Sequence, residues 1–324
     1  MTKLIRNAVK GMAMGIAEVI PGVSGGTIAF ITGIYEQLLN SIKAFGPGLF
    51  TTFRTSGIKG VAEEVNATFL LSLAVGMVFG IVIGVFGVSF LLENYPPLVW
   101  AFFFGLIIAS AIYVGKQIDR WGIGEIVLLI IGTLIAYGIT VLAPANGSTS
   151  LPFVYLSGLI AISALILPGI SGSFILLLMG MYSFIITDTL RPALRTLAPD
   201  KLLIMFVFAL GCLTGLMTLS RVLSWTFKQY RNLTLAILTG FMVGSLNKIW
   251  PWRVPTEWLR DQAGAILLKD DGTPKKILLE QNVFPEQFES LTGAEPYFIG
   301  VVILVLVGFA SVFLMERLSN ESNT

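Results

Sequence analysis

The sequence predicts an all-α polytopic membrane protein made of two inverted-topology repeats, each a re-entrant broken-helix hairpin plus three transmembrane helices. Two observations carry this prediction. The first is composition: 55% of the 324 residues are hydrophobic and only 12% are charged, and the mean hydropathy is +0.84. Soluble domains of this size do not have such a composition. The second is a glycine-rich motif that occurs twice, each time inside an apolar stretch.

The two copies of the motif are closely similar. The first reads Pro-Gly-Val-Ser-Gly-Gly-Thr-Ile from Pro21, and the second reads Pro-Gly-Ile-Ser-Gly-Ser-Phe-Ile from Pro168. The offset of 147 positions between the prolines recurs between Gly33 and Gly180. A constant offset over such a stretch indicates a tandem duplication.

A second register extends the duplication beyond the motifs. Six residues of the first half recur 135 positions later: Ala74 with Ala209, Gly76 with Gly211, Gly80 with Gly215, Tyr95 with Tyr230, Gly105 with Gly240 and Ser110 with Ser245. The change of offset means that the linker after the first motif is 12 residues longer than its counterpart, which fits the glycine-punctuated amphipathic stretch 41–64. Each half is therefore expected to contain a hairpin, a connector and three spans.

Uncharged runs mark the spans along the chain. A span needs roughly 20 apolar residues. One uncharged run, 232–247, is shorter than this length. The run 126–187 carries no charge and is too long for one helix, so it predicts a span followed by the second hairpin. The four runs near or above the required length are 65–92, 97–115, 202–220 and 297–315.

The spans divide the chain into five parts. Residues 1–122 hold the first hairpin and the first two spans, 123–150 the third span, 151–250 the second hairpin and two spans, 251–295 an extracytoplasmic loop, and 296–324 the last span and a cytoplasmic tail. Within the loop, the stretch 265–279 predicts two short strands around an Asp-Gly turn. The loop is either a plain connector or part of a gate.

Positive charges predict the orientation. Three spans are an odd number, so the second half is expected to enter from the opposite side of the membrane. Lysine and arginine gather before the first span, after the second span and around 221–231, which places these regions and both termini in the cytoplasm. Arg191 and Arg195, assigned to the outside, are the exception.

The two motifs also predict an anion site. Pro-Gly ends a helix and Ser-Gly-Gly can begin another, which leaves backbone groups that hydrocarbon cannot satisfy. Free N–H groups at a helix N-terminus, with nearby hydroxyls, suit an anion, and broken helices at matching places in two halves indicate a transport site near the midplane. The candidate cradles are Ser24, Gly25, Gly26 and Thr27 in the first copy, and Ser171, Gly172 and Ser173 in the second.

Other glycines have a simpler interpretation. Pairs spaced by four, such as Gly76 with Gly80 and Gly211 with Gly215, allow two helices to cross closely. We expect these pairs to serve packing alone.

Two charged residues are further candidates. Glu18 is the only charge between Lys10 and Glu36, and the second copy has Leu165 in its place. A carboxylate within a bilayer usually marks function, so Glu18 either exchanges protons or ions during transport or caps free N–H groups of the hairpin. Arg221 ends an uncharged span and is a candidate partner for an anion on the cytoplasmic side, although positive-inside anchoring explains it equally well.

Composition and motifs argue against several other functions. The chain has no histidine, which removes Ser-His-Asp catalysis and histidine-ligated zinc. No Gly-Lys-Ser/Thr follows the glycines, so the motifs are not nucleotide-binding loops. Cys212 is the single cysteine, and the net charge of +2 gives no indication of nucleic-acid binding. We predict no catalytic residue, no metal and no cofactor, and the oligomeric state is not predicted.

The combination Glu18-Val-Ile-Pro-Gly-Val-Ser-Gly-Gly-Thr, Gly33-Ile-Tyr-Glu36 and Leu167-Pro-Gly-Ile-Ser-Gly-Ser resembles the bacterial polyprenyl-phosphate transporter family, long catalogued as a domain of unknown function. The resemblance covers nearly the whole chain. It implies recycling of undecaprenyl phosphate, the lipid carrier of cell-wall precursors, from the outer to the inner leaflet of the cytoplasmic membrane.

The resemblance also implies site residues. The family motif falls on Glu18, Pro21, Gly22, Ser24, Gly25, Gly26 and Thr27, and on Pro168, Gly169, Ser171, Gly172 and Ser173. The second copy has Ser173-Phe174 where the first has Gly26-Thr27, so the two tips are not expected to act equally. The expected partners are a polyprenyl phosphate and the surrounding membrane lipids.

Three other classes are alternatives. A secondary transporter of a small soluble anion would use the same N-termini but needs a hydrated path and binds its ligand without lipid. A membrane-embedded lipid-phosphate enzyme needs a nucleophile with a base or a metal cluster, and the sequence offers only scattered carboxylates. A scaffold protein would not need two broken helices.

Overall fold

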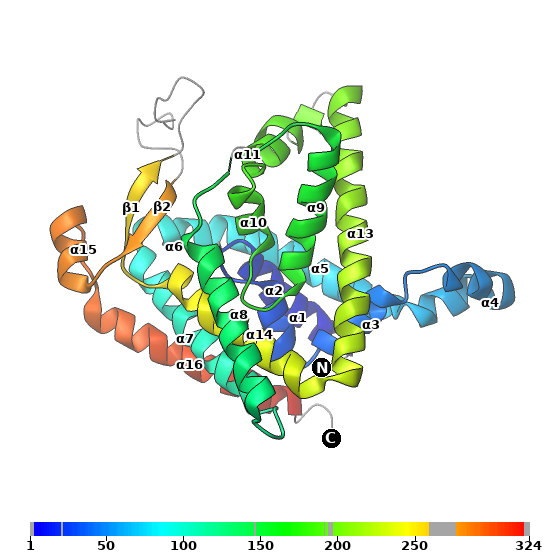
Figure 1. The fold of residues 1–324 in the computed structure, drawn as a ribbon, viewed down its shortest axis with the longest axis horizontal. Helices are drawn as coiled ribbons and strands as arrows, with labels where there is room; N and C mark the ends of the chain where they lie inside the picture. The colour runs from blue at the N-terminus through cyan, green and yellow to red at the C-terminus, as the bar shows by residue number, and fades with distance from the viewer. Residues whose placement is uncertain are drawn as a thin grey trace.

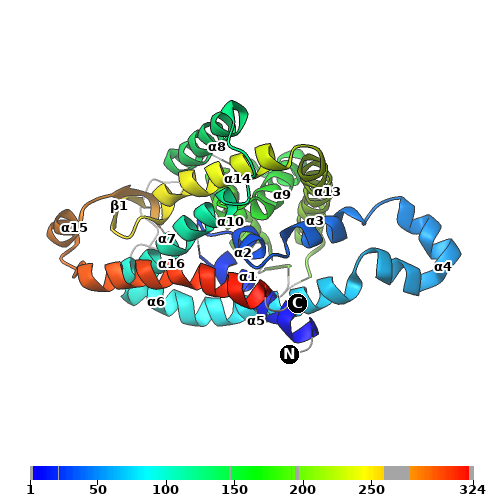
Figure 2. The ribbon, with the colours of Figure 1, turned by 90° about the horizontal axis from the view of Figure 1, so that it is seen from below.

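The computed structural model describes residues 3–20, 22–145, 147–190, 192–193, 197–258 and 277–320. These residues form a bundle of helices with one two-stranded sheet at its edge (Figure 1). Figure 2 shows α1 and α2 in the centre of the bundle, with α5 and α16 on one side and α8 on the opposite side. The N-terminal motif therefore lies in the interior of the molecule.

The described residues of the first half form eight α-helices. Helices α1 and α2 flank the first motif, and α5 continues through a π-helical segment, Gly84–Val88, into α6. The bounds are α1 Lys3–Glu18, α2 Gly25–Ile31, α3 Tyr35–Lys43, α4 Gly48–Glu64, α5 Ala67–Ile83, α6 Ser89–Asn94, α7 Pro96–Gly115 and α8 Ile123–Val141.

The second half also begins with two helices that flank a motif, and it contains the sheet. Helices α9 and α10 flank the second motif, a π-helical segment covers Ile186–Leu190, and a 3₁₀ turn covers Leu246–Ile249. The bounds are α9 Leu151–Ile166, α10 Gly172–Leu178, α11 Tyr182–Ile185, α13 Pro199–Gln229, α14 Arg231–Ser245, β1 Arg253–Trp258, β2 Ile277–Asn282, α15 Pro285–Thr292 and α16 Phe298–Asn320.

Five helices among the described residues are long and apolar enough to cross a membrane, namely α5 with α6, α7, α8, α13 and α16. A sixth span results if α10 and α11, which are bent by 111° at their junction, count as one. The chain is thus an all-α multi-pass membrane protein, as predicted. The expected short span 232–247 corresponds to α14, whose 15 residues are fewer than the roughly 20 that cross a bilayer unaided.

Helix packing follows the two registers of the sequence. Helix α1 packs on α5 and α9 packs on α13, while α7 packs on α16 and α14 packs on α8. A Cβ atom on Gly76 would press on the carbonyl of Ala8, and one on Gly211 would press on the carbonyl of Tyr155. These contacts are equivalent in the two halves. The predicted packing role of the glycines spaced by four is therefore confirmed.

The glycines of α7 and α8 allow a test of this packing. A Cβ on Gly105 would press on the carbonyl of Val305 in α16, whereas nothing lies within 4 Å of the Cβ position of Gly138. Gly105→Ala should lower the thermal unfolding temperature in detergent, because overpacking costs about 1–3 kcal/mol. Gly138→Ala should leave it unchanged or raise it, since alanine is favoured over glycine in a helix by about 1 kcal/mol. Equal shifts in the two variants would contradict the α7–α16 contact.

The strand pair differs from the sequence prediction. The expected strands lay within 265–279 on either side of an Asp-Gly turn, and that turn falls outside the described residues. The described strands are β1 and β2, which pair antiparallel from Arg253 opposite Asn282 to Trp258 opposite Ile277. A strand over Arg253–Trp258 was not predicted, whereas β2 overlaps the end of the predicted stretch. The residues that flank the strand pair are joined by a hydrogen bond from Nε1 of Trp250 to the carbonyl of Val283 at 2.9 Å.

Candidate functional site

The first motif interrupts the helix as predicted. Helix α1 ends at Glu18 and α2 begins at Gly25. Gly22 has a φ of 91°, a left-handed conformation that glycine adopts without steric cost. Ser24 is the N-cap of α2, where its Oγ accepts a hydrogen bond from the backbone N–H of Gly26 at 3.1 Å. Pro21 lies outside the described residues.

The second motif has the same local geometry. Helix α9 ends at Ile166 before Pro168, and α10 begins at Gly172. Gly169 has a φ of 83°. Ser171 caps α10 by accepting from the N–H of Phe174 at 3.4 Å, and its Oγ lies 3.0 Å from that of Ser173. The shared residue pattern thus produces the same turn and cap twice.

The two tips contact each other directly. The Ser24 hydroxyl donates to the carbonyl of Leu165 at 2.9 Å, and the N–H of Gly169 donates to Oγ1 of Thr27 at 3.1 Å. Ser24 and Thr27 are completely buried. Segments that lie more than 140 residues apart in sequence are therefore joined by hydrogen bonds in the interior.

Glu18 lies at the N-terminus of α2. Its Oε1 accepts a hydrogen bond from the N–H of Gly25 at 2.6 Å. A carboxylate of the chain itself thus occupies a position that the sequence suggested for an external anion. This contact matches the capping interpretation of Glu18, and proton coupling stays a prediction.

The other amides of the first tip also have protein partners. The N–H of Thr27 donates to the carbonyl of Ser24 at 3.0 Å. Gly172 permits a close approach, because a Cβ there would press on the carbonyl of Ala161. Ser173 is half-buried. An anion at the first tip must therefore replace the Glu18 carboxylate to reach the N–H of Gly25.

Arg221 has a local structural role in this conformation. Its guanidinium donates to the carbonyl of Met217 at 3.0 Å and to that of Phe45 at 2.8 Å. It thereby ties α13 to the connection between α3 and α4. None of the hydrogen bonds that join the two tips involves Arg221.

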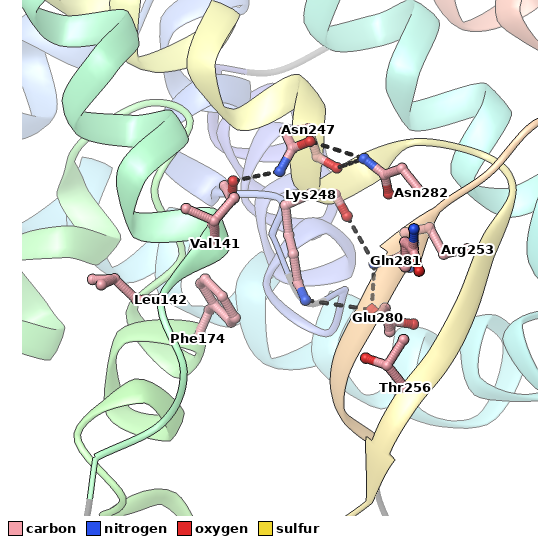
Figure 3. Close-up of a pocket in the computed structure, with 11 residues that line it drawn as sticks. Val141, Leu142, Phe174, Asn247, Lys248, Arg253, Thr256, Glu280, Gln281 and Asn282 are labelled. Atoms are coloured by element: carbon pink, nitrogen blue, oxygen red, sulfur yellow. Dashed lines mark hydrogen bonds and ion pairs between the residues drawn. The ribbon is translucent and has the colours of Figure 1, made fainter.

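A cluster of charged residues next to the tips was not predicted. Glu280 on β2 accepts from Nζ of Lys248 at 3.3 Å and from Nη1 of Arg253 at 2.7 Å. Figure 3 shows Lys248 reaching toward Glu280 across a pocket of about 300 Å³. We call it the Lys248 pocket. It is lined by Thr140, Val141, Leu142, Phe174, Asn247, Lys248, Arg253, Thr256, Glu280, Gln281 and Asn282.

Lys248 connects this pocket to both motifs. A Cβ on Gly22 would lie 3.0 Å from Cγ of Lys248, so the lysine stem packs on the first tip. Its ammonium lies 4.7 Å from the ring centre of Phe174, in the first turn of α10. The position of Lys248 directly after the uncharged run 232–247 was the one signal in the sequence. Arg253 and Glu280 gave none.

Both cations are largely removed from water. They lie beyond the end of α14, outside the membrane-spanning helices. Burial lowers the pKa of the Lys248 ammonium, and the Glu280 carboxylate opposes that shift. Burial also lowers the pKa of the Arg253 guanidinium, yet arginine stays protonated in proteins. Two cations thus share one carboxylate.

A second polar pocket lies at the other end of α14. Its volume is about 390 Å³, and it is lined by Glu36, Leu39, Asn40, Lys43, Ser224, Phe227 and Lys228. Ser224 accepts from Nζ of Lys43 at 3.3 Å and donates to Oδ1 of Asn40 at 2.9 Å. Polar pockets therefore lie near both ends of α14.

Comparisons with known proteins identify the family. Residues 14–267 match the family model described as VCA0040-like, undecaprenyl phosphate translocase-like. A polyprenyl-phosphate transporter of Vibrio cholerae serotype O1 (strain ATCC 39315 / El Tor Inaba N16961) is 41% identical over 312 residues, which cover 96% of each chain. A polyprenyl-phosphate transporter of Staphylococcus aureus (strain NCTC 8325 / PS 47) is 32% identical over 262 residues, 76% of this chain and 86% of that protein. No solved structure matches the chain at a significant level. The chain belongs to the VCA0040-like family of undecaprenyl phosphate translocase-like proteins.

Proposed function

We propose that this protein moves a polyprenyl phosphate, with undecaprenyl phosphate as the expected substrate, from the outer to the inner leaflet of the bacterial cytoplasmic membrane. The phosphate headgroup passes between the two motif tips while the prenyl tail stays in the bilayer. The hydrogen bonds between Ser24 and Leu165 and between Thr27 and Gly169 carry this proposal, because they place both interrupted helices at one interior point. The names of the two relatives support the substrate class.

The proposed architecture is a pair of inverted repeats with re-entrant hairpins, both termini lying in the cytoplasm. The registers of the sequence pair α1 with α9, α5 with α13 and α7 with α14, and the next span of each half pairs α8 with α16. The α1–α5 contact therefore has the α9–α13 contact as its counterpart, and the α7–α16 contact has the α14–α8 contact. Such a pattern supports two equivalent units related by a two-fold operation. In transporters of this kind the substrate binds where the repeats meet.

Glu18 gives the transport cycle a proton step. A phosphomonoester carries a charge of about −1.5 to −2 near neutral pH. It competes with the Glu18 carboxylate for the N–H of Gly25. The released carboxylate, surrounded by apolar residues, takes up a proton rather than remain charged. No covalent bond forms or breaks, so the cycle is transport and not catalysis.

The test is leaflet exchange in liposomes that contain the purified protein and labelled undecaprenyl phosphate. We expect exchange to be faster than in protein-free liposomes, and we expect undecaprenol, which lacks the phosphate, not to be exchanged. Exchange at the protein-free rate would contradict the proposal. Uptake of free inorganic phosphate without lipid exchange would instead support the small-anion alternative.

Replacement of Glu18 by glutamine tests the proton step. Glutamine keeps an oxygen that can accept from Gly25 but cannot titrate. Glu18→Gln should make leaflet exchange independent of pH over the range in which the wild-type rate changes. The matched control is Glu63→Gln on the exposed surface of α4. An unchanged pH dependence in Glu18→Gln would remove Glu18 from the coupling.

A further inference from the structure

We propose that the Lys248 pocket is a separate binding site for the phosphomonoester headgroup of a prenyl lipid, from which the headgroup moves to the motif tips. Lys248 and Arg253 are the anion-binding cations, and Glu280 is the carboxylate that the phosphate replaces. This inference rests on the proposed function and adds a second site to it.

The charge balance of the pocket favours a dianion. Lys248 and Arg253 share the single carboxylate of Glu280. Compared with a carboxylate, a phosphomonoester carries more negative charge and has three acceptor oxygens. An arginine guanidinium matches phosphate geometry with two parallel hydrogen bonds. A lipid phosphate can therefore take the place of Glu280 between the two cations.

Arg253 has an unused donor in this pocket. Only 5% of its side chain is exposed, and its Nε has no hydrogen-bond partner. Its Nη1 is held by the carbonyl of Lys248 at 2.8 Å, and the guanidinium stacks 3.9 Å from the ring centre of Trp100. A buried donor without a partner costs about 1–3 kcal/mol. A ligand oxygen at Nε would remove this cost.

The position of the pocket fits a headgroup on its way to the tips. Lys248 packs on Gly22 of the first motif and lies against Phe174 of the second. A phosphate held by Lys248 is thus next to the turn that Ser171 caps. No other positively charged side chain in the described residues has recorded contacts with both motifs.

The walls of the pocket favour a lipid over free phosphate. Val141, Leu142 and Phe174 provide an apolar surface beside the cations. A prenyl chain can pack on such a surface, whereas inorganic phosphate gains nothing from it. Opposite, Asn247 is held by Thr140 at 2.7 Å and by Asn282 at 2.9 Å, which fixes the polar wall.

The experiment measures binding of farnesyl phosphate, a short prenyl phosphate, to the full-length protein in detergent by calorimetry. Farnesol and inorganic phosphate are the comparison ligands. The contribution of the second motif tip is measured in parallel with Ser171→Leu. Ser24→Leu serves as the background because it disables the first motif tip. In that background, Lys248→Gln should weaken farnesyl phosphate binding at least tenfold, and Glu280→Gln should strengthen it several-fold. Lys59→Gln, on the exposed face of α4, is the matched control and should change nothing.

The possible outcomes separate the two proposals. If Lys248→Gln and Glu280→Gln both bind farnesyl phosphate with the affinity of Ser24→Leu alone, the proposed site in the Lys248 pocket is overturned. This holds even if leaflet exchange by the wild-type protein supports the proposed function. Inorganic phosphate binding as tightly as farnesyl phosphate would overturn the lipid assignment. If Lys248→Gln does not fold, Glu280→Gln alone decides, because a purely structural ion pair predicts no gain in phosphate affinity. The proposed function fails if liposomes with the wild-type protein exchange undecaprenyl phosphate no faster than protein-free liposomes.

Discussion

Replacing Ser24 by leucine is expected to reduce leaflet exchange of undecaprenyl phosphate at least about thirtyfold while the protein still inserts into the membrane. The Ser24 hydroxyl is completely buried and makes two hydrogen bonds, one from the N–H of Gly26 and one to the carbonyl of Leu165. Leucine would leave both groups without a partner, at about 1–3 kcal/mol each. Because each 1.4 kcal/mol is about tenfold in rate, the loss of two such bonds corresponds to about a thirtyfold or larger change. The measurement is the exchange rate in proteoliposomes with equal amounts of reconstituted protein.

Two further variants complete this experiment. Ser171→Leu should have a comparable effect, because Ser171 caps the other tip. Ser72→Leu is the matched control: Ser72 is half-buried on α5 and donates only to the carbonyl of Phe69 in its own helix, at 2.9 Å. It should exchange lipid at the wild-type rate. Wild-type exchange in both Ser24→Leu and Ser171→Leu would contradict a role of the tips in transport.

Replacing Gly169 by alanine is expected to destabilise the protein far more than the same change at Gly22. Both glycines have a positive φ, so alanine costs about 1–2 kcal/mol at either position. At Gly169, however, the new Cβ would also lie 2.8 Å from backbone atoms of Phe241 and Met242 in α14. At Gly22 its nearest neighbour is the flexible side chain of Lys248, at 3.0 Å.

The two alanine variants serve as controls for each other. Overpacking against backbone adds about 1–3 kcal/mol at Gly169, so the total there is roughly 2–5 kcal/mol. Thermal unfolding in detergent should show a clear drop for Gly169→Ala and a smaller one for Gly22→Ala. The opposite order would show that the second tip does not pack against α14 as described.

The parts of the fold that depend on local rules were predictable from sequence. The helix breaks follow from Pro-Gly, which requires a turn, and from serine, which caps the next helix; both motifs therefore gave the same geometry. The packing glycines were predictable because only a missing side chain allows two helix backbones to touch. The spans followed from the lack of charge.

Contacts between distant segments were not predictable. Lys248 follows α14 and Glu280 lies on β2, and nothing in either neighbourhood of the sequence indicates that they meet. Arg221 was a candidate either for an anion or for positive-inside anchoring, and neither interpretation indicated that the carbonyl of Phe45, in the α3–α4 connection, is its partner. Such pairings depend on how whole helices are placed.

The start of β1 was missed for a physical reason. The strand Arg253–Trp258 contains Pro255, and proline weakens the signal of a strand because it cannot donate to a sheet. In a two-stranded sheet both strands are edges, where a proline is tolerated. The two apolar runs of 265–279, separated by an Asp-Gly turn, gave a stronger local pattern and led to the prediction there.

The most direct test of the account is whether the lipid phosphate protects the motif tips from chemical modification. In a Cys212→Ser background, Ser173→Cys places a thiol at a half-buried position beside Ser171, where a small methanethiosulfonate reagent can label it. We expect undecaprenyl phosphate to slow labelling at least about tenfold and undecaprenol to leave the rate unchanged. Labelling that proceeds at the same rate with and without undecaprenyl phosphate would contradict a headgroup site between the tips.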